Sequence, residues 1–564
     1  MIGLNTTING ANLITLSGGN ATSLFAVSSS VTLTLQNIIL SNAFGSGDGG
    51  AIVNNGTLVV TNSTIQNSQA AAGFSGGAIV STGPVTISGS TLANNSATNG
   101  GALYPRFAGA VVTITNSVLH DNHATGTDYN TGGWGGAILV WDGATVNLVG
   151  SDLYNNTAEE GGALNSRQAN SSIMLQGTQA HDNHVLEYGG GIYALGTLTV
   201  ANSTISGNVS GGGGGLWTLG TVTLTDSTVS GNMIDGFGGG LSGQGTTTLS
   251  RVTITGNTAT QDGGGVENNS GTMHLTDVTI SNNTSTAEGG GIVNFGQTDL
   301  TNVTLSGNSA PLGGSAIVQR SGTAVTLKNT IIAKGSRGGN CLVPAGNFQP
   351  IISNGFNLSD DTSCAGYFNQ SGDQNNVPAG LGALANNGGP TQTHLPQPGS
   401  LAIDHGTTAG CPATDQRGLP RPVGLSCDVG AVEVQLPPTA TPTRTPPPPT
   451  ATPYPRPNVA VQVAPSAGTL QTTIAARDAG CAGGNNQLQS VQVTRLTNAT
   501  VDVATAPVTT VSSARTTVSL PAHPATIGLT VHRLTPGQAA TVELIVTDGC
   551  GAWPTFVGGG PTAF

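Results

Sequence analysis

The chain has 564 residues, of which 86 are glycine, 7% are charged and 4% are aromatic. This composition differs from that of an ordinary cytosolic enzyme and is typical of a β-rich extracellular protein with many turns. A net charge of −12, with only 15 lysines and arginines, argues against nucleic acid and anionic lipid as partners, because too few cations remain for phosphate contacts.

The first residues do not resemble an export signal. Residues 1–5 lack a basic start followed by a continuous apolar core, and no stretch of the chain is long and apolar enough to cross a membrane. Because the composition is that of an exported protein, we expect that the signal peptide is missing from this chain. Residues 1–48 are predicted to form one or two irregular opening coils, with strands at 13–16 and 31–35.

A glycine pair followed by a small and an aliphatic residue then recurs eleven times. The pairs begin at Gly49, Gly76, Gly100, Gly135, Gly161, Gly189, Gly213, Gly238, Gly263, Gly289 and Gly313. The period of about 26 residues indicates stacked supersecondary units. Only the third interval is markedly longer, which predicts an inserted loop at 124–134, and inserted loops often carry function.

A second mark lies midway between the glycine pairs, where an asparagine closes a short β-branched run. It is absent from the first two repeats, which have Ala43 and Ser68. The other nine repeats have Asn95, Asn122, Asn156, Asn183, Asn208, Asn232, Asn257, Asn283 and Asn308. Alternating runs of this kind predict strands with one buried face, and the short repeat leaves no room for an amphipathic helix. Each repeat is therefore predicted to be one coil of two or three strands.

Stacking explains both marks without a ligand. Equivalent residues of successive coils lie about 4.8 Å apart in a parallel sheet. Asparagine amides at that spacing can form a ladder in which each amide donates to the next. Glycine fits where the backbone needs a positive φ or approaches another backbone closely.

The array resembles the polymorphic outer-membrane-protein type of right-handed parallel β-helix, whose repeats pair a Gly-Gly-Ala-Ile element with a Phe-x-x-Asn element. This chain keeps the first element and the asparagine, and has Ile, Leu or Val in place of Phe. The departure favours the wider group of bacterial secreted β-helices over the chlamydial adhesins. The resemblance implies an all-β protein with a pectate-lyase-like solenoid over residues 1–339, whose repeat array is 49–317.

Three further regions follow the solenoid. Residues 340–435 contain NNGGPTQTH (386–394) and TDQRG (414–418), resemble the choice-of-anchor module of bacterial surface proteins, and are predicted to close the last coil's exposed strand edge. Residues 436–458 are rich in proline and threonine and predict an extended linker. Residues 459–564 contain short alternating strands and predict a small β-sandwich.

All six cysteines lie outside the array. Without Cys-x-x-Cys spacing they argue against zinc, and their even number indicates disulfides and an oxidising compartment. Fifteen pairings are open, and we favour the pairing of sequence neighbours: Cys341–Cys364, Cys411–Cys427 and Cys481–Cys550.

One candidate zone for a site lies between residues 100 and 220, where the run HDNH occurs at 120–123 and again at 181–184. If the two asparagines point inward, the flanking histidines should point outward and lie about 10 Å apart across two coils. Two such pairs with their aspartates could bind a metal ion through His120, His123, His181 and His184. We favour the simpler interpretation that the runs are duplicated units that have drifted in sequence, so no metal is expected.

Aromatic residues cluster in the same repeats and are the candidates for ligand binding. They are Tyr104, Trp134, Trp141, Tyr193 and Trp217, with Tyr154 and Tyr188 close by in the sequence. Aromatic faces along a β-helix can stack on sugar rings. They can equally fill the bases of turns.

Catalysis is the competing hypothesis. Polysaccharide lyases of this fold resemble the chain, but they need calcium-binding carboxylates and a basic residue, and between 49 and 317 only Arg106, Arg167 and Arg251 are basic. Calcium has no support, because the repetitive Gly-Gly-x-Gly-x-Asp pattern is absent. A glycoside hydrolase would need paired carboxylates, for which Glu160, Asp182 and Glu187 are the weak candidates.

The sequence therefore predicts a non-catalytic, adhesin-like β-helix, secreted or at the cell surface, that acts as a monomer without a cofactor and contacts glycans or other surfaces. A lyase or glycoside hydrolase that uses the face formed by residues 120–190 is one alternative. A purely structural envelope protein is the other.

Overall fold

The structure is a computed structural model that describes residues 1–435, apart from 128–131, 321–322, 334, 336 and 347, and the backbone of nine strands between 460 and 559. The chain divides into two units, Met1–Thr439 and Ala440–Phe564, which are treated separately below. The described residues form strands and turns with no helix, so the predicted all-β class is confirmed.

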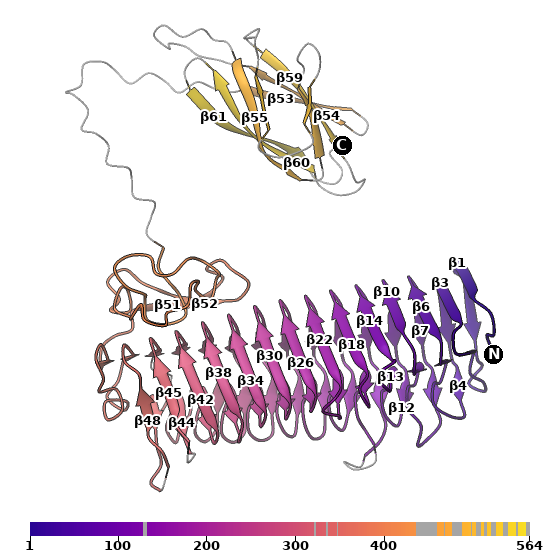
Figure 1. Cartoon of the computed structure of the whole chain (residues 1–564), viewed down its shortest axis with the longest axis horizontal. Coiled ribbons are helices and arrows are strands. Elements are labelled where there is room, and N and C mark those ends of the chain that lie inside the picture. The colour runs from indigo at the N-terminus through magenta and orange to yellow at the C-terminus, as the bar shows by residue number, and fades with distance from the viewer. Residues whose placement is uncertain are drawn as a thin grey trace. The chain divides into compact units, whose positions relative to one another are not determined.

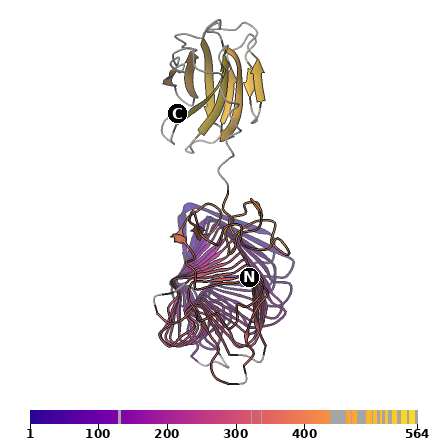
Figure 2. The same ribbon diagram turned by 90° about the vertical axis from the view of Figure 1, so that its left-hand side faces the viewer.

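The first unit is a parallel β-helix (Figures 1 and 2) whose coils contribute strands to three parallel sheets. One coil of the array runs through β5 (Ile52–Asn54), β6 (Thr57–Thr61), β7 (Thr64–Gln66) and β8 (Gln69–Ala70). The strand β5 lies in a 13-stranded sheet, called sheet A here. The strands β6 and β7 lie in the 27-stranded sheet B, and β8 lies in the 10-stranded sheet C.

Sheet A contains one strand from each of its coils. Its strands are β2 (Phe25–Val27), β5, β9 (Ile79–Ser81), β13 (Leu103–Pro105), β17 (Ile138–Val140), β21 (Leu164–Ser166), β25 (Ile192–Ala194), β29 (Leu216–Thr218), β33 (Leu241–Gly243), β37 (Val266–Asn268), β41 (Ile292–Asn294), β44 (Ile317–Gln319) and β47 (Cys341–Leu342). Sheet C has shorter strands. They are β4 (Phe44–Gly45), β8, β12 (Ser96–Ala97), β16 (His123–Ala124), β20 (Thr157–Ala158), β24 (His184–Val185), β28 (Val209–Ser210), β32 (Met233–Ile234), β36 (Thr258–Ala259) and β40 (Thr284–Ser285).

Sheet B consists of two adjoining ladders, and its first two strands, β1 (Thr6–Ser17) and β3 (Thr32–Ser41), run through both. The first ladder continues with β6, β10 (Val85–Ser88), β14 (Val111–Thr115), β18 (Thr145–Val149), β22 (Ser172–Gln176), β26 (Thr197–Ala201), β30 (Thr221–Thr225), β34 (Thr246–Ser250), β38 (Thr272–Thr276), β42 (Gln297–Thr301), β45 (Val325–Lys328) and β48 (Ile351–Ser353). The second continues with β7, β11 (Thr91–Ala93), β15 (Val118–His120), β19 (Asp152–Tyr154), β23 (Gln179–His181), β27 (Thr204–Ser206), β31 (Thr228–Ser230), β35 (Thr253–Thr255), β39 (Thr279–Ser281), β43 (Thr304–Ser306), β46 (Ile331–Ala333), β49 (Leu358–Ser359) and β50 (Gln374–Asn375).

Alternation along each strand builds the core. In β6 and β7 the side chains of Leu58, Val60 and Ile65 are completely buried, and the threonines between them are partly exposed. Successive coils repeat this pattern, so one apolar cluster extends from Val27 to Phe368. Burial of this continuous apolar column is the main force that holds the coils together.

The glycine pair serves both purposes that the sequence predicts. Gly49 has a φ of 80°, which L side chains rarely adopt. The second residue, Gly50, lies against the next coil, and a Cβ atom there would meet the Gly77 carbonyl oxygen at 2.0 Å. Both members of the pair are therefore needed for the turn into sheet A.

The asparagine ladder is confirmed. Asn122 donates from Nδ2 and from its backbone N–H to Oδ1 of Asn156, at 3.0 Å each, and Nδ2 also donates to the Leu92 carbonyl oxygen. The same contacts link each of the nine predicted asparagines to the next, and all nine are buried. The ladder begins at Ser68, whose backbone N–H donates to Asn95.

The β-helix extends past the predicted boundary at residue 339. Cys341 pairs in register with Ile317 in sheet A, and β48 to β50 extend sheet B as far as Asn375. The buried ring of Phe368 joins the end of the apolar core. The coils therefore continue as far as residue 375, because the alternating residues that follow the array still pair in the parallel sheets.

Residues 376–435, called the lateral segment here, pack against the outer face of sheet B instead of following the coils (Figure 1). The segment contains one antiparallel hairpin, β51 (Leu381–Ala385) and β52 (Thr393–Pro396). Thr253 donates to the Gln392 carbonyl oxygen at 2.6 Å, and Thr279 donates to the side chain of Gln416 at 2.6 Å.

Two of the three predicted disulfides are confirmed, Cys341–Cys364 and Cys411–Cys427. The third prediction, Cys481–Cys550, lies outside the described residues, as does the predicted linker at 436–458.

The second unit contains two antiparallel sheets. The five-stranded sheet has the order β53 (Ala460–Ser466), β54 (Thr469–Ala475), β59 (Thr526–Arg533), β56 (Ala499–Val503) and β57 (Thr509–Val511). The four-stranded sheet has the order β58 (Thr516–Ser519), β55 (Leu488–Thr497), β60 (Ala540–Asp548) and β61 (Gly551–Gly559).

Candidate functional site

The outer face of sheet A gathers the predicted aromatic residues into one patch. Parallel register places Asn165, Tyr193 and Trp217 side by side in β21, β25 and β29. Single bridges place Trp134 beside Glu160 in the turns that lead into the sheet. The patch, called the aromatic patch here, comprises Tyr104, Trp134, Trp141, Glu160, Asn165, Arg167, Tyr188, Tyr193 and Trp217.

The first part of the patch is a stacked pair of indoles. The rings of Trp134 and Trp141 lie 5.6 Å apart at an interplanar angle of 8°. Trp134 is only 8% exposed, whereas Trp141 is partly exposed. Trp134 offers little open ring face, because Trp141 and the Arg167 side chain lie against it.

The second part lies two coils further on. The rings of Tyr188 and Trp217 are 4.5 Å apart and both residues are partly exposed, whereas Tyr193, the neighbour of Trp217 in register, is 5% exposed. Tyr193 is thus a supporting residue that offers little open ring face. Tyr188 was not among the predicted ligand residues. Its position directly before a glycine pair, equivalent to that of Trp134 and Glu160, is the sequence signal for it.

A row of polar side chains separates the two aromatic pairs. It consists of Glu160, Asn165 and Arg167 and is called the Arg167 row here. The Arg167 guanidinium lies 4.2 Å from the centre of the Trp134 ring and 5.7 Å from that of Tyr193. Its Nη1 is ion-paired with Oε2 of Glu160, and Asn165 donates from Nδ2 to the same oxygen at 3.4 Å. Cation–π contact and ion pairing together hold the arginine flat against the sheet.

Glu160 is an acid without access to solvent. Its side chain is 0% exposed, and burial raises the pKa of its carboxyl above the ordinary value, while the Arg167 guanidinium opposes that shift. A general acid must reach the leaving group within hydrogen-bond distance. The Glu160 carboxyl instead contacts Arg167 and Asn165, so its role is to hold the arginine in place.

Of the other two candidate acids, Glu187 lies near Glu160 and Asp182 does not. Asp182 lies at the corner between β23 and β24, outside sheet A, and its carboxylate contacts the His181 ring at 2.7 Å. Glu187 lies in the turn before Tyr188, on the coil next to Glu160, and its charge adds to the raised pKa of Glu160. The structure therefore brings Glu160 and Glu187 together and keeps Asp182 apart.

The histidines also divide into two groups. His120 and His181 lie in sheet B with Tyr154 between them in register, and the three rings stack at 5.0 Å and 5.3 Å. His123 and His184 lie in sheet C, on either side of Thr157. The inward asparagine between each pair turns the chain from one sheet into the next, so the four imidazoles do not converge. Across the part of the chain that is described, no three histidine, cysteine, aspartate or glutamate side chains gather as metal ligands would.

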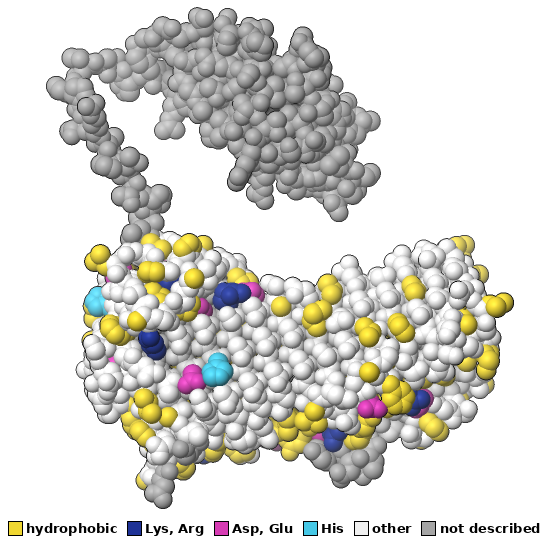
Figure 3. All heavy atoms as spheres, viewed as in Figure 1, with side chains coloured by type: hydrophobic (Ala, Val, Ile, Leu, Met, Phe, Trp, Pro, Cys, Tyr) yellow, Lys and Arg dark blue, Asp and Glu magenta, His cyan; other side chains and the backbone are white. Residues whose placement is uncertain are grey.

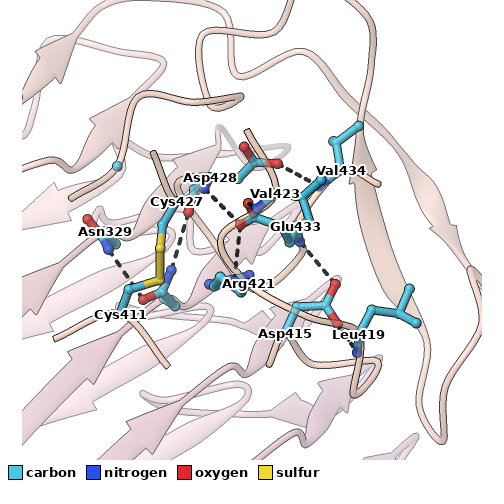
Figure 4. Close-up of polar contacts among 12 residues, drawn as sticks. Asn329, Cys411, Asp415, Leu419, Arg421, Val423, Cys427, Asp428, Glu433 and Val434 are labelled. Atoms are coloured by element: carbon cyan, nitrogen blue, oxygen red, sulfur yellow. Dashed lines mark hydrogen bonds and ion pairs between the residues drawn. A yellow bond between two sulfur atoms is a disulfide. The ribbon is translucent and has the colours of Figure 1, made fainter. Parts of the chain in front are cut away.

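A second polar cluster lies in the lateral segment (Figure 4). Arg421 has a fully buried side chain, with Nε 3.3 Å from Oε2 of Glu433. Glu433 also accepts from the backbone N–H groups of Val423 and Asp428. Asp415 holds Arg417 through Oδ2 at 2.7 Å. These contacts and the Cys411–Cys427 disulfide hold the lateral segment together, so the polar cluster has a structural role.

The rest of the surface offers few charges. The face of the β-helix seen in Figure 3 is mostly uncharged, with scattered hydrophobic side chains and isolated acidic, basic and histidine side chains. The threonines and serines of sheet B account for this face.

Comparison with known families agrees with the geometry. A family model described as the right-handed beta helix region matches residues 49–234, and the Chlamydia polymorphic membrane protein repeat matches residues 277–294. No curated protein and no solved structure matches the chain. The fold and these matches define a right-handed parallel β-helix protein. One of its repeats, at residues 277–294, is similar to the polymorphic membrane protein repeat. A search of the described residues finds no helix suited to crossing a membrane.

Proposed function

We propose that this protein is a non-catalytic β-helix, secreted or displayed at the cell surface, that contacts glycans through the aromatic patch of sheet A. The two family matches and the low content of charged residues support the location. The observation that carries the binding role is the placement of two aromatic pairs on either side of the Arg167 row.

The chemistry of the patch suits sugars. Aromatic rings bury a large apolar area at a low cost in conformational entropy, and indole and phenol groups add a polar edge. The apolar face of a pyranose ring packs against such surfaces. Trp141, Tyr188 and Trp217 are partly exposed, so each can be reached by a ligand at the surface.

A binding role fits the acids better than a catalytic one. Glu160 is buried and ion-paired, and Asp182 lies at a different corner of the coil. A glycosidase needs two accessible carboxyls that face each other across the scissile bond.

A glycan microarray probed with the labelled full chain tests the proposal. The native protein should bind a defined set of glycans, and the Trp141→Ala/Trp217→Ala double variant should lose the signal. Tyr154→Ala is the matched control, because it removes a partly exposed aromatic ring from sheet B, outside the patch. An unchanged signal in the double variant would rule out the patch as the binding surface.

Enzymatic activity is tested separately with reducing-sugar and unsaturated-product assays on polysaccharides. We expect no turnover. Turnover that disappears in Glu160→Gln or Glu187→Gln would contradict the non-catalytic assignment and favour a carbohydrate-active enzyme.

A further inference from the structure

We infer that the aromatic patch takes a neutral, linear polysaccharide whose chain runs parallel to the axis of the β-helix, from the coil of Trp141 to the coil of Trp217. The inference rests on the proposed function and specifies the class and orientation of the ligand. Three features of the patch carry it: the direction of the aromatic row, its extent and its charge.

The direction follows from the register. Leu139 pairs with Asn165, Asn165 with Tyr193, and Tyr193 with Trp217, so these residues occupy four consecutive coils. Trp141 follows Leu139 by two residues, and Tyr188 lies in the coil of Tyr193. A ligand that lies along one strand stays within a single coil and would meet only one of the two aromatic pairs. A ligand lying along the axis meets both.

The extent sets a minimum ligand length. Adjacent strands of a sheet are about 4.8 Å apart, so three steps from Trp141 to Trp217 span roughly 14 Å. That distance exceeds the length of a disaccharide. An oligosaccharide that engages both aromatic pairs therefore needs at least three sugar units, with its middle unit over the Arg167 row.

The charge distinguishes neutral from acidic glycans. Arg167 is ion-paired with Glu160, and Arg106, at the edge of the patch, is ion-paired with Asp48 at 2.9 Å. The acidic side chains of Asp142, which is exposed, and Glu187, which is partly exposed, lie on the same coils. The chain as a whole carries a net charge of −12. A uronate or sulfate chain would meet paired cations and a negative field, which disfavours its association.

The two aromatic pairs also differ in a way that suits a chain of sugars. Trp134 and Trp141 stack almost parallel, at 8°, whereas Tyr188 and Trp217 are tilted by 38°. Successive units of a linear polysaccharide turn their faces relative to each other. The tilted rings of Tyr188 and Trp217 can therefore face different units of one chain.

Isothermal titration with oligosaccharides of defined length tests the inference. Probes are the neutral cello-, xylo- and manno-oligosaccharides from two to six units, and the acidic hexamers of galacturonate and guluronate. At least one neutral series should bind, with affinity rising about tenfold between two and four units. The acidic hexamers should bind at least about tenfold more weakly at low salt, where charge repulsion is strongest.

Variants connect the result to the patch. Trp141→Ala and Trp217→Ala should each weaken binding of the neutral hexamer about tenfold, and Tyr154→Ala should leave it within about twofold. Trp141→Leu, which fills the space without the ring face, should weaken binding like Trp141→Ala and covers the case in which the alanine variant does not fold. Circular dichroism melts verify folding of each variant.

The outcomes separate the two levels of the proposal. Tighter binding of an acidic hexamer, lost in the tryptophan variants, would overturn the neutral ligand class and leave the glycan role standing. Affinity that does not depend on length beyond two units would overturn the axial orientation. Absence of binding to every probe and to the microarray would overturn both.

Discussion

The Arg421 guanidinium of the lateral segment lies 3.4 Å from the Asp277 carboxylate of a β-helix coil, measured from Nη1 to Oδ1, and both side chains are buried. The two residues join parts of the chain that the parallel ladders do not connect. Arg421 also contacts Glu433, so one cation faces two anions. Burial raises the pKa of Asp277 to about 7, with the Arg421 guanidinium opposing the shift and Asp415 adding to it.

The raised pKa of Asp277 predicts that the docking of the lateral segment depends on pH. Its folded pKa is higher than its ordinary value of 3.8, so the folded state holds the proton more tightly than the unfolded state. This contribution to stability is complete below pH 4 and is lost as the pH rises through about 7. We predict that Asp277→Asn is more stable than the native chain at pH 8, by an amount on the order of 1 kcal/mol or more, and similar to it at pH 4.5.

Urea unfolding at both pH values measures this difference. Arg251, Arg421, Asp415 and Glu433 face the same carboxyl and remain in place in the variant. Asp235→Asn is the control, because Asp235 is exposed and should give the same small difference at both pH values. A pH profile for Asp277→Asn that parallels the native profile would contradict the prediction.

His394 contributes the opposite trend at the same interface. Its Nε2 lies 2.8 Å from the Ser281 hydroxyl, and its Nδ1 lies 2.7 Å from the Gly382 carbonyl oxygen. Burial lowers the pKa of His394 below its ordinary value of 6.5. Stability from this residue is therefore present above pH 6.5 and falls as the pH drops through the folded pKa. We expect His394→Gln to lose less stability than the native chain between pH 6.5 and 4.5, and the exposed His405 gives the matched His405→Gln control.

The asparagine ladder should be the most sensitive part of the core. Asn183 accepts from the backbone N–H and Nδ2 of Asn156 and donates to Asn208 at 2.9 Å. We predict that Asn183→Ala lowers the free energy of unfolding by about 3 kcal/mol, because two buried donors lose their acceptor. Asn183→Asp should be worse, since it buries a charge.

Urea titration of the full chain provides the measurement. Asn147 lies on the outer face of sheet B and is the control, because Asn147→Ala should change stability by no more than about 0.5 kcal/mol. Equal effects at the two positions would show that the ladder does not stabilise the coils.

The Cys411–Cys427 disulfide should fasten the lateral segment without supporting the coils. It closes a loop of 16 residues that contains Asp415, Arg417 and Arg421. Replacement of both cysteines by alanine should destabilise the segment by about 3 kcal/mol. Limited proteolysis should then cut between residues 404 and 430 well before it cuts the array. Cleavage in the array at the same rate would show that the two regions unfold together.

The β-helix could be predicted from the sequence because the features that build it recur from repeat to repeat. A period near 26 residues, β-branched alternation and two columns of glycine and asparagine specify a parallel stack. These features are local or recur at a fixed interval. They need no knowledge of which distant surfaces meet.

The site was predictable only in part. The aromatic positions emerged from the repeat, but their exposure did not, because it depends on Arg167 reaching from its own coil over Trp134 of the preceding coil. The sequence alone also does not show that the asparagine corner sends the four histidines to different sheets. The packing of Gln416 on Thr279, 137 residues away, has no signal in a single sequence.

Tryptophan fluorescence during titration with a neutral hexasaccharide tests the central claim most directly, because three of the four tryptophans lie in the aromatic patch. The native chain should show a saturable change in emission that is lost when Trp141 and Trp217 are both replaced by phenylalanine and kept when Tyr154 is replaced by alanine. A saturable change of equal size in the Trp141→Phe/Trp217→Phe variant, or none in the native chain with any neutral hexamer, would contradict the assignment of sheet A as the surface that meets the ligand.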